Sequence, residues 1–257
     1  TQAQSACAQA KDLPNVFPVS GSSPSAYMLR LTYGIGMSDP VVAAKRDAGI
    51  RAADMVKDGM IVGLGTGSTV FFAMERLGER IRTEGLQIFG VPTSNQTAMR
   101  AEEYGIPLTT LTLHPVLDLA IDGADQVDPG KRMIKGRGAA HLREKVVADA
   151  AKQFIVVIDA GKQVTGLSAA VPVEVLPFAY GSVARRLREL GGDPVMRNGV
   201  KKDGPVISDN GNYVIDCGFG EIADPVALEE TLHNIPGVLG CGIFAHMTGK
   251  TTVIVGK

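Results

Sequence analysis

Short apolar runs alternate with amphipathic segments between residues 41 and 158, and this alternation constrains the fold more than any other feature of the sequence. The apolar runs predict strands at Met60–Leu64, Leu86–Val91, Leu117–Ile121 and Phe154–Ile158. The segments around them predict helices at Val41–Val56, Val70–Thr83, Gln96–Tyr104 and His141–Gln153. Such alternation is typical of an α/β fold, in which a mostly parallel core sheet carries helices on both faces.

A different pattern begins after Pro172. Strands are predicted at Val173–Leu176, Pro194–Arg197, Tyr213–Cys217 and Val238–Phe244, and helices at Tyr180–Leu190 and Pro225–Ile235. This β-α-β-β-α-β order is typical of a ferredoxin-like α+β domain. We therefore expect an α/β core at residues 37–171, a ferredoxin-like domain at 172–246, and a strand at 247–257 that returns to the core.

Residues 1–36 are interpreted as a leader or an added extension that is poorly structured. Their only charges are Lys11, Asp12 and Arg30, and their apolar residues follow neither a helical nor a strand period. The segment from Met37 looks like a natural start, because Ser38 or Asp39 can cap a helix and Pro40 suits its first turn.

The composition excludes several classes of protein. Hydrophobic residues make up 45% of the chain and charged residues 21%, and 26 basic against 27 acidic side chains leave a net charge of -1. This balance excludes disorder for most of the chain and shows no basic surface for nucleic acid. No apolar run approaches the about 18 residues of a membrane span. The three cysteines, Cys7, Cys217 and Cys241, lie far apart, which fits a reducing compartment such as the cytoplasm.

A glycine-rich turn, Gly63–Thr69, joins a predicted strand to a predicted helix. Its glycines allow close approach of the backbone to a ligand, and its hydroxyl groups at a helix N-terminus favour an anion. The dinucleotide-binding fingerprint fails, because Ser68 stands where its third glycine belongs and no acidic residue follows the next strand. The turn therefore favours a phosphate monoester, although an ordinary tight turn would look the same.

Two further motifs follow neighbouring elements. Asp122-Gly123-Ala124-Asp125 comes directly after a predicted strand, where its carboxylates could bind sugar hydroxyls, move protons or, with further ligands, hold Mg²⁺. Lys135-Gly136-Arg137-Gly138 leads into the helix that carries Glu144, and it combines an anion-binding turn with a mobile charge. Lys162 follows the buried strand Phe154–Ile158. Because parallel strands end at one edge of a sheet, these groups are expected to converge there.

In order and spacing, these motifs resemble the ribose-5-phosphate isomerase family, type A. The resemblance also covers Lys162-Gln163, Pro172–Val175 and Asn234–Val238, so it runs from about residue 41 to the C-terminus. It implies a Rossmann-like catalytic core with a ferredoxin-like lid, and an enzyme of the pentose phosphate pathway that interconverts D-ribose 5-phosphate and D-ribulose 5-phosphate. It also implies that no cofactor or metal takes part, that the partner is a small pentose phosphate rather than nucleic acid or membrane, and that the chain forms a homodimer or tetramer.

The resemblance also implies roles for individual residues. Glu144 is the expected general base that moves a proton from C2 to C1 through a cis-enediolate. The N–H groups of the Gly136–Gly138 loop and a nearby lysine are expected to stabilise that enediolate, Asp122 or Asp125 to help open the sugar ring, and Ser68, Thr69 and Lys135 to hold the phosphate. The expected substrate-binding residues are Thr66, Gly67, Ser68, Thr69, Asp122, Gly123, Ala124, Asp125, Lys135, Gly136, Arg137, Gly138, Glu144 and Lys162.

Two positions depart from the family pattern. Arg137 stands where the family commonly has glycine and would be strained at a positive φ, while His141 replaces an apolar or small residue and is expected on the helix surface.

Three other functions stay open. A regulator that senses sugar phosphates would need a DNA-binding helix-turn-helix, for which only residues 1–36 are spare. A CoA-transferase would use a glutamate nucleophile on a similar sheet, and a nucleotide-dependent dehydrogenase is disfavoured by Ser68.

Overall fold

The computed structural model describes residues 40–257, so the extension expected at 1–36 and the caps expected at Ser38 or Asp39 lie outside the described residues. The helices are α2 (Pro40–Ala53), α3 (Ser68–Glu84), α4 (Asn95–Glu103), α5 (His141–Ala150), α6 (Tyr180–Glu189) and α7 (Pro225–His233). The strands are β1 (Ile61–Leu64), β2 (Phe89–Pro92), β3 (Leu117–Asp122), β4 (Gln126–Val127), β5 (Met133–Ile134), β6 (Ala151–Ile158), β7 (Val171–Val175), β8 (Asp193–Met196), β9 (Tyr213–Gly218), β10 (Val238–Cys241), β11 (Ile243–Phe244) and β12 (Thr251–Val255).

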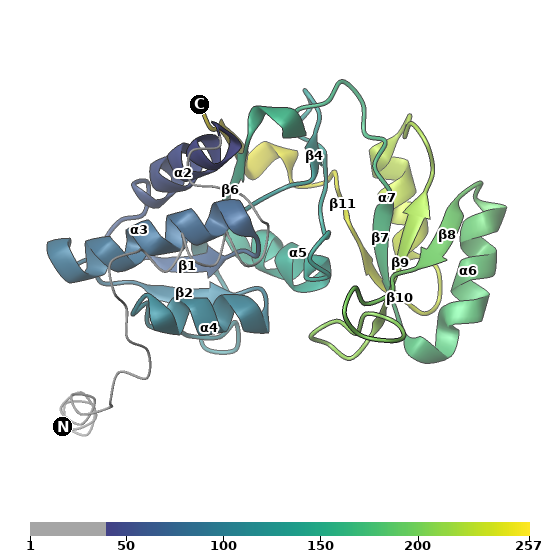
Figure 1. Ribbon diagram of the computed structural model, residues 1–257, viewed down its shortest axis with the longest axis horizontal. Helices are drawn as coiled ribbons and strands as arrows, with labels where there is room; N and C mark the ends of the chain where they lie inside the picture. Colours follow the sequence, from purple (N-terminus) through teal and green to yellow (C-terminus); the bar gives the residue numbers. More distant parts are fainter. Residues whose placement is uncertain (1–39) are drawn as a thin grey trace. The chain divides into compact units, whose positions relative to one another are not determined.

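A five-stranded sheet with the order β12-β6-β3-β1-β2 forms the α/β core (Figure 1), and every neighbouring pair in it is parallel. The predicted parallel sheet is confirmed, and so is the return of the last strand, because β12 pairs with β6. Several boundaries were wrong: the helix expected to reach Val56 ends at Ala53, and the strand expected from Leu86 begins at Phe89. The helix expected to reach Gln153 ends at Ala150, because Ala151 already pairs with Leu117 of β3.

Helices cover both faces of this sheet, as predicted. Side chains of α2, α3 and α4 pack in one hydrophobic cluster with one face of the sheet, whereas Val147 and Ala148 of α5 pack with the other face. Alternate residues of each strand point to opposite faces, so Leu119 and Ile121 of β3 join the first cluster while Ala120 joins the second.

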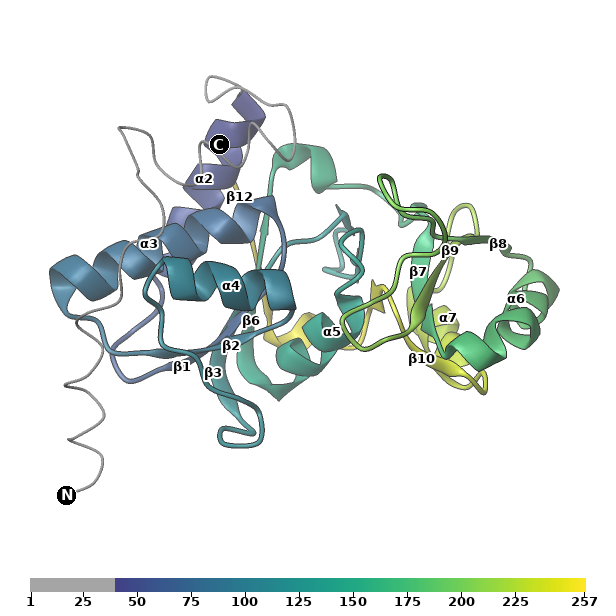
Figure 2. The same cartoon turned by 60° about the horizontal axis from the view of Figure 1, so that its bottom comes forward.

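A second, antiparallel sheet with the order β10-β7-β9-β8 carries α6 and α7 on one face. The β-α-β-β-α-β order of the chain and this strand order give the predicted ferredoxin-like arrangement. Helix α5 contacts β3, β6 and also β10. It lies between the two sheets in both views (Figures 1 and 2).

A third sheet, with the order β11-β5-β4, was not predicted. The single strand expected at Val238–Phe244 divides at Gly242 into β10, which belongs to the four-stranded sheet, and β11, which pairs with β5. Gly242 is needed where the chain changes sheets, because a Cβ there would lie 2.2 Å from the carbonyl oxygen of Lys135. This third sheet connects the two halves of the chain next to Lys135.

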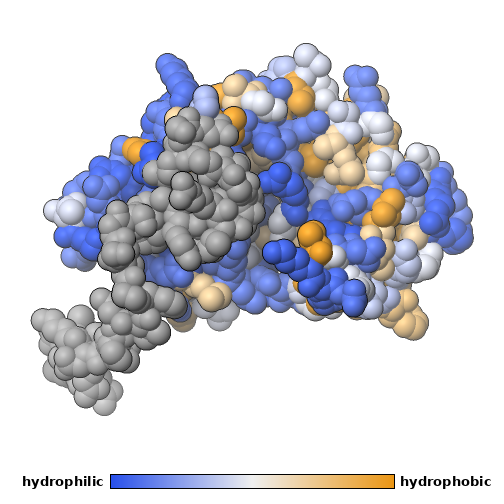
Figure 3. Space-filling model, in the orientation of Figure 1, coloured by the Kyte–Doolittle hydropathy of each residue, from blue (hydrophilic) through white to orange (hydrophobic). Residues whose placement is uncertain are grey.

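No helix within residues 40–257 combines the length and apolar character that crossing a membrane requires. On the uncovered part of the face in Figure 3, hydrophobic residues form small separate areas among hydrophilic ones. The apolar side chains are instead concentrated in three buried clusters, two around the parallel sheet and one in the four-stranded domain.

Candidate active site

The glycine-rich turn and the first aspartate motif meet at the carboxyl edge of the parallel sheet. β1 and β3 are neighbours, and Gly65, which follows β1, donates its N–H to the carbonyl oxygen of Ile121 at 2.9 Å. A Cβ at Gly65 would lie 2.2 Å from Oδ1 of Asp122, so only glycine lets the carboxylate come this close. Thr66 and Gly123 donate their N–H groups to that same oxygen, at 3.2 Å and 2.8 Å. The turn therefore fixes the orientation of Asp122.

Lys135 lies between two carboxylates in the interior. Its Nζ is 3.0 Å from Oδ2 of Asp122 and 3.1 Å from Oε2 of Glu144, and it also donates to the carbonyl oxygen of Gly123. The exposed fractions are 3% for Asp122, 2% for Lys135 and 4% for Glu144. The sequence placed these three residues in separate motifs, and the structure brings them into one cluster that we call the Asp122–Lys135–Glu144 trio.

Burial and neighbouring charge shift the pKa values of the trio. Burial raises the pKa of Glu144 to about 8; Asp122 adds to this shift, while Lys135 opposes it. Burial also raises the pKa of Asp122, again against the pull of Lys135. Burial alone would lower the pKa of Lys135, but the two carboxylates outweigh it and raise that pKa. The trio therefore holds a charged lysine and a carboxyl group that exchanges its proton near neutral pH.

Oε2 of Glu144 has the ion-pair contact with Lys135 but no well-aligned hydrogen bond among residues 40–257. Glu144 lies in the first turn of α5, which no side chain caps. A buried carboxyl oxygen with a free lone pair and a raised pKa is suited to accept a proton from a bound molecule.

The loop from Lys135 to Ala140 connects the lysine of the trio to the start of α5. Asp125 accepts the N–H of Arg137 at 3.1 Å. Gly136 has φ 106° and Ala139 has φ 60°, whereas Arg137 is not among the residues with positive φ. The strain considered for Arg137 is therefore absent at that position and falls on Ala139, and the Arg137 side chain is exposed.

His141 is buried, so the expectation of a helix-surface histidine was wrong. Its exposed fraction is 0%, because the four-stranded sheet packs on this end of α5 and the loop covers the ring. A Cβ at Gly136 would lie 2.8 Å from the Cβ and 2.9 Å from the Nδ1 of His141. Burial, with a further contribution from the charge of Arg197, lowers the pKa of His141 to about 3, so the ring is neutral.

Two of the three residues predicted to bind the phosphate lie at the start of α3, whereas the third, Lys135, lies in the trio. Ser68 and Thr69 open the helix and are buried, Gly67 precedes them at φ 132°, and no side chain caps the helix N-terminus. The hydroxyl group of Thr66 points elsewhere, into a cluster with Thr93 at 2.8 Å and Ser94 at 2.8 Å. Thr66 thus contributes its backbone to the site and its side chain to the interior.

The other predicted residues lie around the trio at different distances. Gly123 contacts Lys135 directly, and Ala124 lies between the two aspartates on a half-buried turn. A Cβ at Gly138 would lie 3.8 Å from the methyl group of Thr66, which places the loop over the glycine-rich turn. Lys162 lies in a short 3₁₀ helix, Ala160–Lys162, that follows β6. The strand order places it at this edge of the sheet, but shows no contact between Lys162 and the trio.

Reasoning from sequence missed two arginines of this site. Arg197 of the four-stranded domain bonds the carbonyl oxygens of Gly136 and Arg137, and Arg143 of α5 bonds Asn210 and Asp209 in a loop of that same domain. By contrast, Arg185 and Arg186 of α6 pair with Glu189 on their own helix. No local signal marks Arg197, because its partners lie about sixty residues earlier in the chain.

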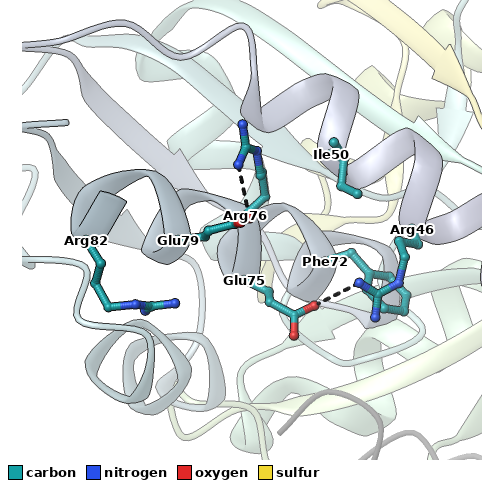
Figure 4. A pocket seen from close by; sticks show the side chains of 7 residues that line it. All are labelled: Arg46, Ile50, Phe72, Glu75, Arg76, Glu79 and Arg82. Atoms are coloured by element: carbon teal, nitrogen blue, oxygen red, sulfur yellow. Dashed lines mark hydrogen bonds and ion pairs between the residues drawn. The ribbon is translucent and has the colours of Figure 1, made fainter. Parts of the chain in front are cut away.

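A groove of about 310 Å³ between α2 and α3 contains none of the predicted site residues (Figure 4). Its charged side chains largely neutralise one another: Arg46 lies 3.5 Å from Glu75, and Arg76 lies 3.0 Å from Glu79. Within residues 40–257 no group of three or more histidine, cysteine, aspartate or glutamate side chains is arranged to hold a metal ion. The buried trio is therefore the candidate site.

Comparisons with known proteins show the family of the chain. The family model of ribose 5-phosphate isomerase A, or phosphoriboisomerase A, matches residues 89–257. Ribose-5-phosphate isomerase A of Methanoregula boonei is 62% identical over 222 residues, covering 86% of this chain and 93% of the relative. The protein of the same name from Trichormus variabilis is 52% identical over 223 residues, covering 86% and 94%.

Solved structures give the same result. Ribose 5-phosphate isomerase A of Methanocaldococcus jannaschii matches with a TM-score of 0.79 at 45% identity, covering 83% of this chain and 94% of that chain. A D-ribose-5-phosphate isomerase in complex with phospho-erythronic acid matches with a TM-score of 0.81 at 42% identity, covering 85% and 96%. The chain belongs to the ribose 5-phosphate isomerase A family, and it is an aldose–ketose isomerase.

Proposed function

We propose that the protein interconverts D-ribose 5-phosphate and D-ribulose 5-phosphate, with Glu144 as the general base. The observation that carries this proposal is the buried contact of Glu144 with Lys135, 3.1 Å apart at the carboxyl edge of the sheet. Family membership supports the substrate, since the relatives are named for it. The family also disfavours the regulator, the CoA-transferase and the dehydrogenase.

The reaction needs one base that works on one face of the open-chain sugar. Glu144 takes the proton from C2, the electrons of that C–H bond form the C1–C2 double bond, and the C1 oxygen becomes negatively charged. The same carboxyl group then gives its proton to C1 while the hydroxyl proton of O2 is lost to O1, which yields the ketose. A pKa of about 8 suits a group that must both take and return a proton near neutral pH.

Lys135 is assigned to the enediolate rather than to the phosphate. Its ammonium group is buried and directed at Asp122 and Glu144, so it lies beside the atoms that the base attacks. A fixed positive charge in a water-poor site stabilises an oxyanion more strongly than the same charge in solvent. The phosphate is assigned to Ser68, Thr69 and the N-terminus of α3, with Lys162 as its cation.

Ring opening is assigned to Asp125. Asp122 already accepts hydrogen bonds from two backbone N–H groups and pairs with Lys135, so its role is to hold that lysine. Asp125 is half-buried and its Oδ2 accepts one N–H, from Arg137. Its remaining lone pairs can accept the hydroxyl proton of the closed sugar.

We further propose that the enzyme serves the pentose phosphate pathway in the cytoplasm as a homodimer or tetramer that works without metal or cofactor. These statements rest on the family resemblance. The mass of the protein in solution, measured by light scattering, tests the oligomeric state directly.

The variant Glu144→Gln tests the proposed base. It keeps the shape of the side chain but cannot accept the C2 proton, and loss of a general base costs about 10²- to 10⁴-fold in rate. We expect kcat for ribose 5-phosphate to fall by that order while KM stays within a few-fold. Turnover is measured as formation of the ketose in the presence of a chelator, which should leave the unsubstituted protein active.

Glu102→Gln is the matched control, because Glu102 is an exposed residue of α4 outside the site. It should match the unsubstituted protein in kcat and KM. Undiminished turnover by Glu144→Gln would remove Glu144 from its proposed role, and activity that a chelator abolishes and Mg²⁺ restores would show that the aspartates hold a metal.

A further inference from the structure

Arg197 is fixed by its own domain in two places. It follows β8, where its backbone N–H donates to the carbonyl oxygen of Val214 at 2.9 Å. Its Nε donates to Oδ2 of Asp216 at 2.8 Å, and its Nη2 donates to the other oxygen of that carboxylate. Such a two-point pair fixes the plane of the guanidinium as well as its position. The remaining nitrogen, Nη1, therefore has a defined direction.

Nη1 reaches across to the loop beside the trio. It donates to the carbonyl oxygen of Gly136 at 2.9 Å and to that of Arg137 at 3.1 Å. In a planar trans peptide the N–H points opposite to the carbonyl group. Because both carbonyl groups face Arg197, the N–H groups of Arg137 and Gly138 face away from it. The N–H of Arg137 reaches Asp125. The N–H of Gly138 is therefore directed to the same side of the loop, which is the side of the site.

This loop has one internal hydrogen bond, from the N–H of Ala139 to the carbonyl oxygen of Gly136 at 3.0 Å, and further support comes from outside it. Gly136 and Ala139 both have positive φ, and a non-glycine residue keeps such a conformation only when its surroundings impose it. On one side the loop packs on the buried ring of His141, which comes so close that a Cβ at Gly136 would overlap it. On the other side Arg197 holds two successive carbonyl groups. The loop is thus held between an imidazole of the core and a guanidinium of the four-stranded domain.

We infer that Arg197, held by Asp216, is a positioning residue that aims the Gly138 N–H at the reacting end of the sugar. The inference rests on the proposed isomerase function for its catalytic consequence, and on the loop geometry alone for the positioning itself. It makes the four-stranded domain a part of the catalytic apparatus, although within residues 40–257 no side chain of β7–β10, α6 or α7 forms a hydrogen bond or ion pair with the side chains of the trio.

The experiment compares Arg197→Met, Arg197→Lys and Asp216→Asn with Arg186→Met. Arg186 is the matched control, because it is an exposed arginine of the same domain whose partner, Glu189, lies on its own helix. Two quantities are measured for each protein: hydrogen–deuterium exchange of the amides at residues 136–140, and kcat and KM for ribose 5-phosphate.

For Arg197→Met we expect exchange in this loop to become at least about tenfold faster, and kcat to fall about 10²-fold with KM within about threefold, since a displacement near 1 Å costs that much. Lysine can reach one carbonyl but cannot also grip Asp216, so Arg197→Lys should recover part of kcat. The kcat of Asp216→Asn should lie between those of Arg197→Met and Arg197→Lys. Arg186→Met should match the unsubstituted protein.

Each outcome decides the inference. Unchanged exchange at 136–140 in Arg197→Met overturns it, whatever the activity. Faster exchange with unchanged kcat also overturns it, because the loop would then move without consequence. If Arg197→Met does not fold, Asp216→Asn and Arg197→Lys carry the same two readouts. An unsubstituted protein that does not convert ribose 5-phosphate contradicts the proposed function instead, and the exchange measurement still decides whether Arg197 positions the loop.

Discussion

At the scale of single residues, the chemistry follows from one cation buried between two carboxylates. Lys135, Asp122 and Glu144 would carry a net negative charge in the interior if both carboxyl groups were ionised, and burial makes that state costly. Burial raises the pKa of Glu144 to about 8, and the neighbouring charge of Asp122 adds to the shift. Burial also raises the pKa of Asp122, although Lys135 and two backbone N–H groups favour its ionised form.

This arrangement predicts the pH dependence of the reaction. Glu144 must be ionised to take a proton, so kcat/KM, which reports the free enzyme, should rise with pH through about 8 and then level off. Asp125 helps to raise this pKa, so Asp125→Asn should move the midpoint to lower pH. The pH profiles of the two proteins for ribose 5-phosphate check this. A midpoint that is unmoved, or moves upward, would contradict the charge coupling.

The same shift makes a prediction for stability. The folded protein keeps a proton on Glu144 up to a pH of about 8, whereas the unfolded chain loses it near the ordinary value of 4.5. The free energy of unfolding should therefore fall as pH rises between these values, because the folded state binds more protons. Glu144→Gln, which has no proton to lose, should flatten this slope in denaturant titrations.

At the scale of elements, the sequence predicts well what depends on local periodicity and on the ends of parallel strands. Asp122 and Gly65 could be placed at one edge because strands alternate with helices, and glycine-rich turns follow strands in such folds. The strands β4 and β5 have two residues each, too few to show a period, so they were missed. Arg197 was missed because its contact with Gly136 depends on how two domains pack.

The geometry of the loop from Lys135 to Ala140 predicts that both stability and activity are sensitive to substitution of Gly136. In Gly136→Ala the new Cβ would meet His141 at 2.8 Å and the residue would have to keep φ 106°, so the loop must move. We expect a loss of about 1–3 kcal/mol in stability from the strain and a fall of about 10²-fold in kcat from the displaced donors. Melting curves and kcat values for the variant check both effects.

Gly59→Ala is the control for this change. Gly59 also has a positive φ, 78°, but a Cβ there meets nothing within 4 Å. It should show the backbone cost alone, about 1–2 kcal/mol, with unchanged kcat. Equal losses of activity in the two variants would mean that the contact with His141 does not control the site.

At the scale of the whole molecule, the described residues belong to one compact unit although two kinds of sheet contribute to it. Lys145 of α5 joins them: its ammonium group pairs with Glu229 of α7 and lies 4.7 Å above the ring of Phe244. Glu229 in turn accepts the N–H of Ala245 at 2.8 Å. The periodic patterns of the sequence indicated both domains but not this contact between them, because an ion pair between distant helices has no periodic signal.

The contact between Lys145 and Glu229 predicts that the core and the four-stranded domain unfold together. Glu229→Ala leaves the ammonium group of Lys145, whose side chain is 13% exposed, without its carboxylate, and loss of one partner of a buried ion pair costs about 3–5 kcal/mol. For a domain of this size, each kcal/mol lowers Tm by about 2–4 °C, so we expect Tm to fall by roughly 10 °C in one cooperative transition. Glu230→Ala, at a neighbouring exposed position, should change the free energy of unfolding by less than about 0.5 kcal/mol. Two separate transitions in calorimetry, with the core melting as before, would instead show that the domains are held together elsewhere.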